Sequence, residues 1–247
     1  MKKVFSMILI LAGFLLLLGC GGDQQEKEQA EESLPTLNQQ QIDSILNVVR
    51  ETPKESVAED EVGVIETNYG TIVVELFEEI APVHAMNFKR LAEAGYYDGT
   101  TFHRVIPGFM IQGGDILSRD ANPENDGTGG PGYNLPAEFS STPHYRGRLS
   151  MARGRQPNTA GSQFFIVQRI ELTRDEISVA EQRVGRQFPD SVVTTYLEKG
   201  GTPFLDDQYT VFGEVLKGMD VVDKIAAVQT KENDRPVEPV VITDLYV

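Results

Sequence analysis

Apolar residues along this chain gather in short runs that glycine, proline and polar residues separate. Residues 62–67 and 71–77 are two such runs, and Asn68-Tyr69-Gly70 between them is typical of a hairpin loop. Residues 240–247 form a similar run rich in valine. This pattern predicts many short antiparallel strands.

Two segments have the period of an amphipathic helix instead. Pro82 suits a first helical turn and Gly95 suits a C-terminal stop, and between them apolar residues recur on one face. A second segment, residues 219–228, places Val222 and Ile225 on one side. Many short strands with two main helices favour a closed antiparallel barrel that helices plug.

Residues 102–115, FHRVIPGFMIQGGD, predict a strand, a tight turn at Pro107-Gly108 and a second strand. Three polar residues, His103, Arg104 and Gln112, interrupt the apolar positions. The arginine is either exposed on an edge strand or partly buried, and a buried arginine needs a partner or a ligand. This stretch alone leaves both alternatives open. We interpret His103 as a structural core histidine rather than an acid or base.

Two further stretches favour an arginine that serves a ligand. PNTAGSQFFI stands at residues 157–166, and FLDDQYTVFG stands at residues 204–213. In order and spacing, the three stretches resemble the cyclophilin family of peptidyl-prolyl isomerases, over residues 62–247. The resemblance implies a mostly β fold, an eight-stranded antiparallel barrel with a helix at each open end, and isomerisation of X–Pro bonds without a cofactor.

The resemblance also implies the residues of the site. Arg104, held by Gln112, takes the catalytic role, because a fixed cationic donor stabilises the twisted bond. The proline ring would lie against an apolar pocket, and neighbouring groups would hold the residue before proline. These substrate-binding positions are Phe109, Met110, Ala152, Arg153, Gln163, Phe165, Phe204, Leu205 and Tyr209.

Three positions depart from the most familiar family pattern. Phe204 stands where many members have tryptophan, Tyr209 where many have histidine, and Arg153 where many have asparagine. None of these changes removes the catalytic arginine, so they bear on ligand affinity more than on activity. Arg153 is expected to contribute mainly its backbone.

Residues 170–203 interrupt the compact family pattern. Residues 173–187 read as a helix, with Thr173 and Glu176 as its capping box. Asp190 is expected to cap a second short helix. The insert is therefore predicted to be a helical hairpin on the surface of the barrel.

The N-terminal residues have the pattern of an export signal. Lys2 and Lys3 precede an apolar run over residues 7–18, which is short for a membrane span. Residues 17–20, ending at Cys20, resemble the signal of bacterial lipoproteins. That resemblance implies removal of residues 1–19, a fatty acid such as palmitate on Cys20, and attachment to a membrane. An uncleaved transmembrane anchor is the alternative.

Residues 20–61 are predicted to be an acidic tether, because the stretch is rich in Gln and Glu. Within it, apolar residues fall on one helical stripe at Ile42, Ile45, Leu46 and Val49. This short helix either docks on the domain or a partner, or is only marginally stable.

Charge and ligand spacing exclude several classes of function. The formal net charge of −15 and the absence of a basic cluster argue against a nucleic-acid partner. The three histidines lack metal-ligand spacing, and His84 is expected on an exposed helix surface. Alternating polar residues resemble the ligands of a calcium loop at Asp120, Asn122, Glu124 and Asp126. The glycine, however, does not stand at the sixth loop position, and the bidentate acid of such a loop is missing. No metal site is predicted.

These observations predict a monomeric prolyl isomerase of the bacterial cell envelope, anchored by lipid, that acts on X–Pro bonds of unfolded or folding exported proteins. The alternative is a non-catalytic peptide-binding or chaperone module on the same fold. Arg104, Phe109 and Gln112 favour the enzyme, whereas the insert leaves room for the second role.

Overall fold

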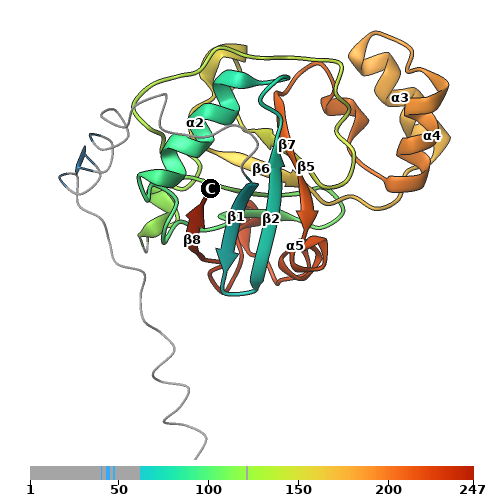
Figure 1. The fold of residues 1–247 in the computed structure, drawn as a ribbon. Helices are drawn as coiled ribbons and strands as arrows, with labels where there is room; N and C mark the ends of the chain where they lie inside the picture. The colour runs from blue at the N-terminus through green and yellow to red at the C-terminus, as the bar shows by residue number, and fades with distance from the viewer. Residues whose placement is uncertain (1–39, 41–42, 45–46, 48–61, 121) are drawn as a thin grey trace, which may run out of the picture. The chain divides into compact units, whose positions relative to one another are not determined.

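The computed structural model describes residues 62–120 and 122–247, together with residues 40, 43, 44 and 47. Within residues 62–247, eight strands form one curled antiparallel sheet, with helices around it (Figure 1). The strands are β1 (Val62–Thr67), β2 (Gly70–Leu76), β3 (Arg104–Ile106), β4 (Met110–Gly113), β5 (Arg148–Met151), β6 (Phe164–Val167), β7 (Val211–Lys217) and β8 (Ile242–Tyr246). The α-helices are α2 (Pro82–Glu93), α3 (Arg174–Val184), α4 (Asp190–Lys199) and α5 (Met219–Ala226). Short 3-10 helices are η1 (Ile116–Arg119), η2 (Pro157–Thr159), η3 (Pro203–Leu205) and η4 (Glu232–Asp234).

The sheet has the strand order β3-β4-β6-β5-β7-β2-β1-β8. Backbone hydrogen bonds between the segment before β3 and the start of β8 bring its ends together. The Phe102 N–H donates to the Val240 carbonyl at 2.9 Å, and the Ile242 N–H donates to the Thr100 carbonyl at 2.8 Å. The prediction of an eight-stranded antiparallel barrel with helices and a helical insert is confirmed.

Alternation along the strands builds the core. In β2, Ile72, Val74 and Leu76 are buried inside the barrel, while the residues between them face outward. Helix α2 places Phe88 over this interior, where its ring centroid lies 5.2–5.5 Å from those of Tyr97, Phe164 and Phe212. Helix α5 packs against β2, β3 and β4 with an apolar face that includes Val222 and Ile225.

His84 is buried, so the prediction of an exposed histidine on α2 is wrong. Its Nδ1 lies 2.7 Å from a carboxylate oxygen of Glu138. The same carboxylate accepts the backbone N–H groups of Val83 and His84, which belong to the first turn of the helix. Glu138 therefore caps the N-terminus of α2 from a distant loop, and an anion is favourable at that end of a helix.

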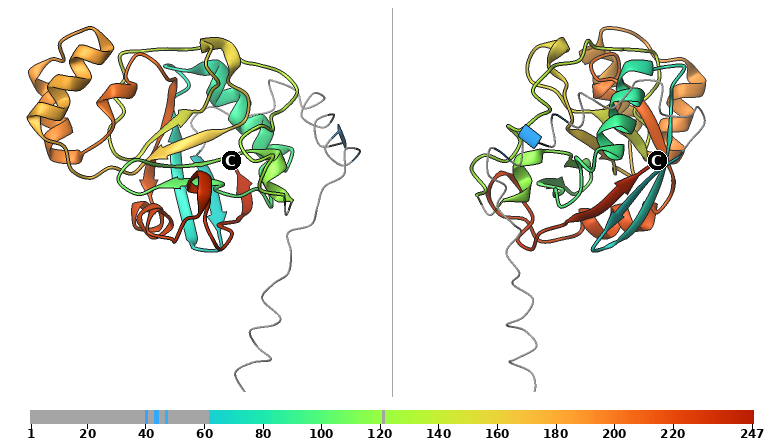
Figure 2. Two further views of the ribbon diagram at one scale, coloured as in Figure 1. Left: turned by 180° about the vertical axis from the view of Figure 1, so that it is seen from behind. Right: turned by 60° about the vertical axis from the view of Figure 1, so that its left-hand side comes forward.

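The insert is a pair of helices, α3 and α4, that lies beside the barrel (Figure 2). Thr173 and Glu176 form the predicted capping box of α3. Helix α4 differs from the expectation: Pro189 is its N-cap and Asp190 is its first residue, without a capping hydrogen bond from its side chain. The insert has its own apolar cluster, formed by Leu172, Ile177, Ala180, Phe188, Val193 and Tyr196.

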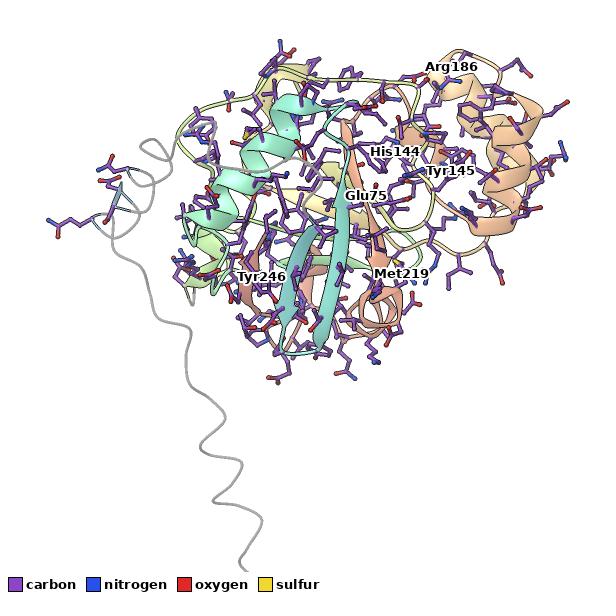
Figure 3. The ribbon with its side chains drawn as sticks, viewed as in Figure 1. Glu75, His144, Tyr145, Arg186, Met219 and Tyr246 are labelled. Atoms are coloured by element: carbon purple, nitrogen blue, oxygen red, sulfur yellow. The ribbon has the colours of Figure 1, made fainter. Side chains whose placement is uncertain are left out.

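A buried polar network joins the insert to the barrel. The Tyr196 hydroxyl donates to the Asp206 carboxylate at 2.8 Å, and the Nδ1 of His144 lies 2.9 Å from the same carboxylate. Tyr145 and His144 lie on the barrel side of the insert (Figure 3). Arg186, after α3, makes an ion pair with Asp207. The insert is thus fixed to the segment that contains η3.

Three predictions lie outside the described residues: the signal at residues 1–19, the lipidation of Cys20 and the apolar stripe of the tether helix. In the part of the chain that the structure describes, no helix is long and apolar enough to cross a membrane.

Candidate active site

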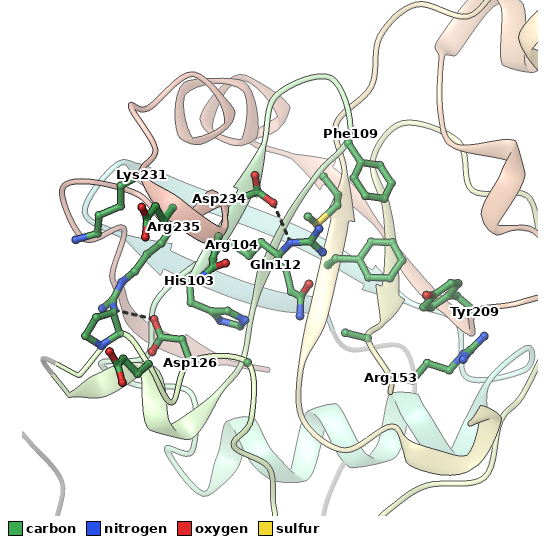
Figure 4. Close-up of a pocket in the computed structure, with 18 of the residues that line it drawn as sticks. His103, Arg104, Phe109, Gln112, Asp126, Arg153, Tyr209, Lys231, Asp234 and Arg235 are labelled. Atoms are coloured by element: carbon green, nitrogen blue, oxygen red, sulfur yellow. Dashed lines mark hydrogen bonds and ion pairs between the residues drawn. The ribbon is translucent and has the colours of Figure 1, made fainter. Parts of the chain in front are cut away.

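A cleft of about 770 Å³ opens beside the β3–β4 hairpin (Figure 4). Its walls include that hairpin, the end of β5, part of β6, the end of η3 and two loops, residues 123–127 and 231–235. The predicted site residues that line the cleft are Arg104, Phe109, Met110, Gln112, Ala152, Arg153, Phe165, Leu205 and Tyr209. Gln163 and Phe204 do not line it.

The hairpin register explains how the functional side chains share one face. Arg104 pairs directly with Gln112 across the two strands, and Met110 lies two residues before Gln112. Because side chains two apart in a strand point to the same face, all three face the cleft. The next strand, β6, pairs Phe165 with Gln112 and so extends the same surface.

The floor of the cleft is apolar. Met110, Phe165 and Leu205 are buried in one hydrophobic cluster, and Phe109 and Tyr209 pack against it. The rings of Phe165 and Tyr209 meet edge to face with centroids 5.7 Å apart. Such a surface can take an apolar ring such as that of proline.

Arg104 stands at the edge of this floor with its side chain 42% exposed. Its Nε donates to Oδ2 of Asp234 at 3.3 Å. In the described residues the guanidinium hydrogen-bonds to Asp234 and not, as expected from the sequence, to Gln112, and the Gln112 amide N–H donates to Gln163. The arginine is therefore fixed by the loop of residues 231–235, which packs beside β3.

Gln163 lies behind the cleft and supports Gln112. Its Oε1 accepts from the Gln112 amide at 3.0 Å, and its own amide donates to the Gly129 carbonyl at 2.9 Å. Its backbone carbonyl accepts the Ala152 N–H at 2.9 Å. We therefore interpret Gln163 as a support for the site residues rather than as a direct peptide contact.

The side chain of Arg153 makes contacts at the cleft, although the sequence predicted that this residue contributes mainly its backbone. Its guanidinium lies 4.6 Å from the ring centroid of Tyr209. Its Nε also donates to the Gln208 carbonyl at 2.9 Å. These contacts hold the Tyr209 ring against the cleft floor, since a cation over an aromatic face is attractive.

Phe204 forms part of the boundary between the cleft and the insert. Its ring centroid lies 5.6 Å from that of Phe109, which faces the cleft. On its other side, the guanidinium of Arg183 in α3 lies 5.2 Å from the Phe204 ring. A second hollow of about 330 Å³ is lined there by Arg169, Leu172, Asp175, Glu176, Val179, Ala180, Arg183, Pro203 and Phe204.

The wall formed by residues 231–235 was not predicted from the sequence. Asp234 contacts Arg104, and Arg235 makes an ion pair with Asp126 at 3.1 Å (Figure 4). The turn-forming Asn233-Asp234 pair indicates a loop. The turn signal does not predict the contact with Arg104, however, because Arg104 and Asp234 are 130 positions apart in the chain.

Two groups that line the cleft have shifted pKa values. Burial lowers the pKa of His103 from 6.5 to about 4, so its ring is neutral near neutral pH. Burial raises the pKa of Asp126 to about 6, against the opposing effect of Arg235. The position of His103, only 5% exposed, agrees with its interpretation as a structural histidine.

The residues weighed as calcium ligands serve the loop itself. The Asp120 carboxylate accepts the Asn122 N–H at 2.7 Å and the Asn125 amide at 3.0 Å. Asn122 in turn accepts the Glu124 N–H at 3.1 Å. Across the described part of the chain, no three His, Cys, Asp or Glu side chains converge in a way that could hold a metal ion.

The arrangement combines an apolar floor for a ring with a charged N–H donor at its edge. Comparisons with known proteins point the same way. A family model described as cyclophilin type peptidyl-prolyl cis-trans isomerase/CLD matches residues 62–247.

Two bacterial relatives are similar over the same share of this chain. A Staphylococcus aureus protein named as a peptidyl-prolyl cis-trans isomerase is 43% identical over 188 residues, which cover 74% of this chain and 90% of the relative. A Streptococcus pyogenes protein named as a bifunctional phosphatase/peptidyl-prolyl cis-trans isomerase is 43% identical over 190 residues. That match covers 74% of this chain but 38% of the relative, so this chain spans well under half of the streptococcal protein.

One solved structure is a cyclophilin type peptidyl-prolyl cis-trans isomerase of Cryptosporidium parvum, crystallised in the presence of the dipeptide Ala-Pro. It aligns with a TM-score of 0.57 and 29% sequence identity. The alignment covers 76% of this chain and 98% of that chain.

Proposed function

Because the chain belongs to the cyclophilin-type peptidyl-prolyl cis-trans isomerases, we propose that it isomerises X–Pro bonds of exported proteins at the bacterial cell envelope. Its substrates are proline-containing segments of unfolded or folding chains. It acts as a monomer that lipid on Cys20 attaches to a membrane. The observation that carries the catalytic part is Arg104 beside the apolar floor of the cleft.

The chemistry needs no covalent step. Amide resonance sets a barrier of roughly 18–20 kcal/mol for rotation about the bond. As the bond twists, the prolyl nitrogen becomes pyramidal and gains a lone pair. A donor that binds this twisted form better than either planar form lowers the barrier. Arg104 suits this role because a guanidinium stays charged and presents a rigid set of N–H donors.

The neighbouring residues hold the peptide while one end rotates. Phe109, Met110, Phe165 and Leu205 receive the proline ring. Gln112, whose amide Gln163 supports, offers its remaining hydrogen-bonding groups to the peptide backbone. The Cryptosporidium parvum neighbour was crystallised with Ala-Pro, and this supports an X–Pro peptide as the ligand of the matching cleft.

The proposed location rests on the N-terminal sequence. Lys2 and Lys3, the apolar run over residues 7–18 and the lone Cys20 together resemble a lipoprotein signal. Dual or multiple acyl chains on one residue attach a protein stably to a membrane. The acidic stretch that follows would then separate the domain from the bilayer.

Fractionation of Cys20→Ala tests the anchor. We expect the wild-type chain to incorporate a radiolabelled fatty acid and to sediment with membranes, and the variant to lose both properties. The peptide-exchange rate of the variant should match that of the wild type, because Cys20 lies outside the isomerase domain. A variant that still sediments with membranes would instead support an uncleaved anchor.

An isomer-exchange assay on a short X–Pro peptide tests the enzyme. We expect the purified wild-type chain to accelerate exchange at catalytic concentrations. A protein without this activity that still suppresses aggregation of an unfolded client would support the peptide-binding alternative.

A further inference from the structure

The one side-chain partner of Arg104 in the described residues is Asp234. The Nε–Oδ2 distance is 3.3 Å, and the two side chains are 42% and 45% exposed. Arginine carries five N–H donors. Because Nε donates to Asp234, the N–H groups of the two terminal nitrogens remain for a ligand in the cleft.

The segment that presents Asp234 is held in an unusual backbone conformation. Asn233 and Asp234 have φ values of 63° and 61°, in the left-handed region. Asn and Asp tolerate this region better than other residues that have a Cβ. The Lys231 N–H donates to the Arg235 carbonyl at 2.8 Å and closes the turn.

A second ion pair fixes the same segment one residue further on. The Arg235 guanidinium lies 3.1 Å from the Asp126 carboxylate, and both side chains are mostly buried. Asp126 belongs to the loop that forms the adjacent wall of the cleft. The turn is therefore anchored by Arg235, while the neighbouring Asp234 reaches Arg104.

Stability alone does not account for this arrangement. An exposed ion pair adds little to the free energy of unfolding, whereas left-handed residues other than glycine cost backbone energy. Strained residues of this kind gather at functional sites. The carboxylate also contacts the one residue to which the proposed chemistry assigns the catalytic donor.

We propose that Asp234 is a positioning residue for Arg104. Its carboxylate takes Nε, fixes the plane of the guanidinium and directs the terminal nitrogens toward the twisted prolyl bond. The fixed guanidinium binds the twisted form of the bond better than the planar forms, so Asp234 should affect kcat more than KM. This inference rests on the proposed role of Arg104.

The test compares Asp234→Asn with the wild type over a range of X–Pro peptide concentrations. Asparagine keeps the size of the side chain and tolerates the left-handed backbone, but it removes the charge. We expect kcat to fall about two- to fivefold, which corresponds to about 0.4–1 kcal/mol in the barrier. KM should change less than kcat, because the apolar floor is untouched.

Measuring kcat at several salt concentrations distinguishes a positioning role that depends on charge from a structural defect of the variant. The Debye length falls from about 10 Å at 0.1 M to about 3 Å at 1 M ionic strength, and exposed pairs are screened. The difference in kcat between wild type and Asp234→Asn should therefore narrow as salt is raised. A defect in folding or shape would leave that difference unchanged.

Two further variants make the result specific. Asp234→Gly removes the carboxylate and suits a positive φ, so it should remain folded and show a similar loss in kcat. Asp220→Asn is the matched control, because Asp220 forms an exposed ion pair with Lys224 on α5 and does not line the cleft. It should leave kcat and its salt dependence unchanged.

Arg104→Ala is measured in parallel. If Arg104→Ala is inactive while Asp234→Asn keeps the wild-type kcat, only the positioning role is overturned. A difference in kcat that does not change with salt, or a loss confined to KM, would overturn it as well. If Arg104→Ala keeps full activity, both the catalytic assignment and this inference are wrong.

Discussion

Arg104 combines a permanent charge with a position at the edge of an apolar cleft. We expect Arg104→Ala to lower the exchange rate on a short X–Pro peptide by about a hundredfold, which is typical for loss of one transition-state donor. Arg104→Lys should also lose at least about tenfold, because a point charge does not reproduce a planar set of donors.

Both variants should remain folded, since the Arg104 side chain is 42% exposed and its ion pair with Asp234 is exposed as well. Circular dichroism and thermal unfolding check this point. An alanine variant that exchanges the peptide at the wild-type rate would contradict the mechanism.

Gln163 holds the Gln112 amide from behind the cleft. Gln163→Leu should reduce the exchange rate and lower the free energy of unfolding by about 1–3 kcal/mol, because the Gly129 carbonyl and the Gln112 amide lose their partner. Peptide exchange and urea unfolding measure the two effects.

The matched control is Gln182→Leu, the same substitution at an exposed position of α3. It should change neither quantity. If Gln163→Leu behaves like this control, the amide pair has no part in the site.

The sequence predicted most residues of the cleft but not their side-chain partners. Arg104, Phe109 and Met110 belong to one hairpin, so local pattern and the family resemblance place them together. The contact from Asp234 crosses 130 positions and depends on how the barrel closes. The partner of the buried His84 is likewise Glu138, which lies on a loop 54 positions away. No local pattern carries that information.

At the scale of the elements, the insert is the main addition to the barrel. Its two ends meet: the carbonyls of Arg169 and Ile170 lie against Gly200, at 2.3 Å from where a Cβ would stand. Gly200 has a φ of 81°, so glycine is required there both by space and by conformation. The helices and the α3 cap were predictable because their signals are local, within residues 173–199.

Deletion of residues 172–201, with a short glycine joint, should leave the barrel folded and most of the tetrapeptide exchange intact. A surface excursion whose ends lie together costs little when it is removed. Exchange in a folding protein client should fall further, because the hollow beside Phe204 disappears with α3. Parallel assays on a tetrapeptide and a slow-folding protein measure the difference.

Tyr196→Phe is the control for this deletion, because the insert also supplies the Tyr196 hydroxyl to the buried Asp206. Loss of one hydrogen bond to a charged group costs about 1.5–3 kcal/mol. If Tyr196→Phe reproduces the whole effect of the deletion, the buried network explains it. Equal losses on both substrates would mean that the insert supports the active site itself.

At the scale of the whole molecule, two buried histidines should make stability depend on pH. Burial lowers the pKa values of both His84 and His103. A histidine with a lowered pKa binds its proton more readily when the chain is unfolded. The free energy of unfolding should therefore fall as the pH falls from about 6.5 toward about 4, the interval set by the two states of His103.

His103→Gln should flatten this dependence. A shift from 6.5 to about 4 corresponds to on the order of 3 kcal/mol between pH 7.5 and pH 4. Urea unfolding of both proteins at several pH values measures the slopes. Asp126 has a raised pKa and works in the opposite direction, but it is present in both proteins. Identical slopes would show that His103 does not titrate in this interval.

The closure of the barrel also determines when each part of the site becomes available as the chain is synthesised. Strand β8 pairs with β1, so the first strand of the domain waits for a partner near position 242. Residues 231–235, which carry Asp234, come just before that partner. A nascent chain that emerges N-terminus first thus has its hairpin and apolar floor before it has the carboxylate opposite Arg104. The carboxylate that fixes Arg104 is therefore among the last parts of the site to be placed, after almost all of the domain has been synthesised.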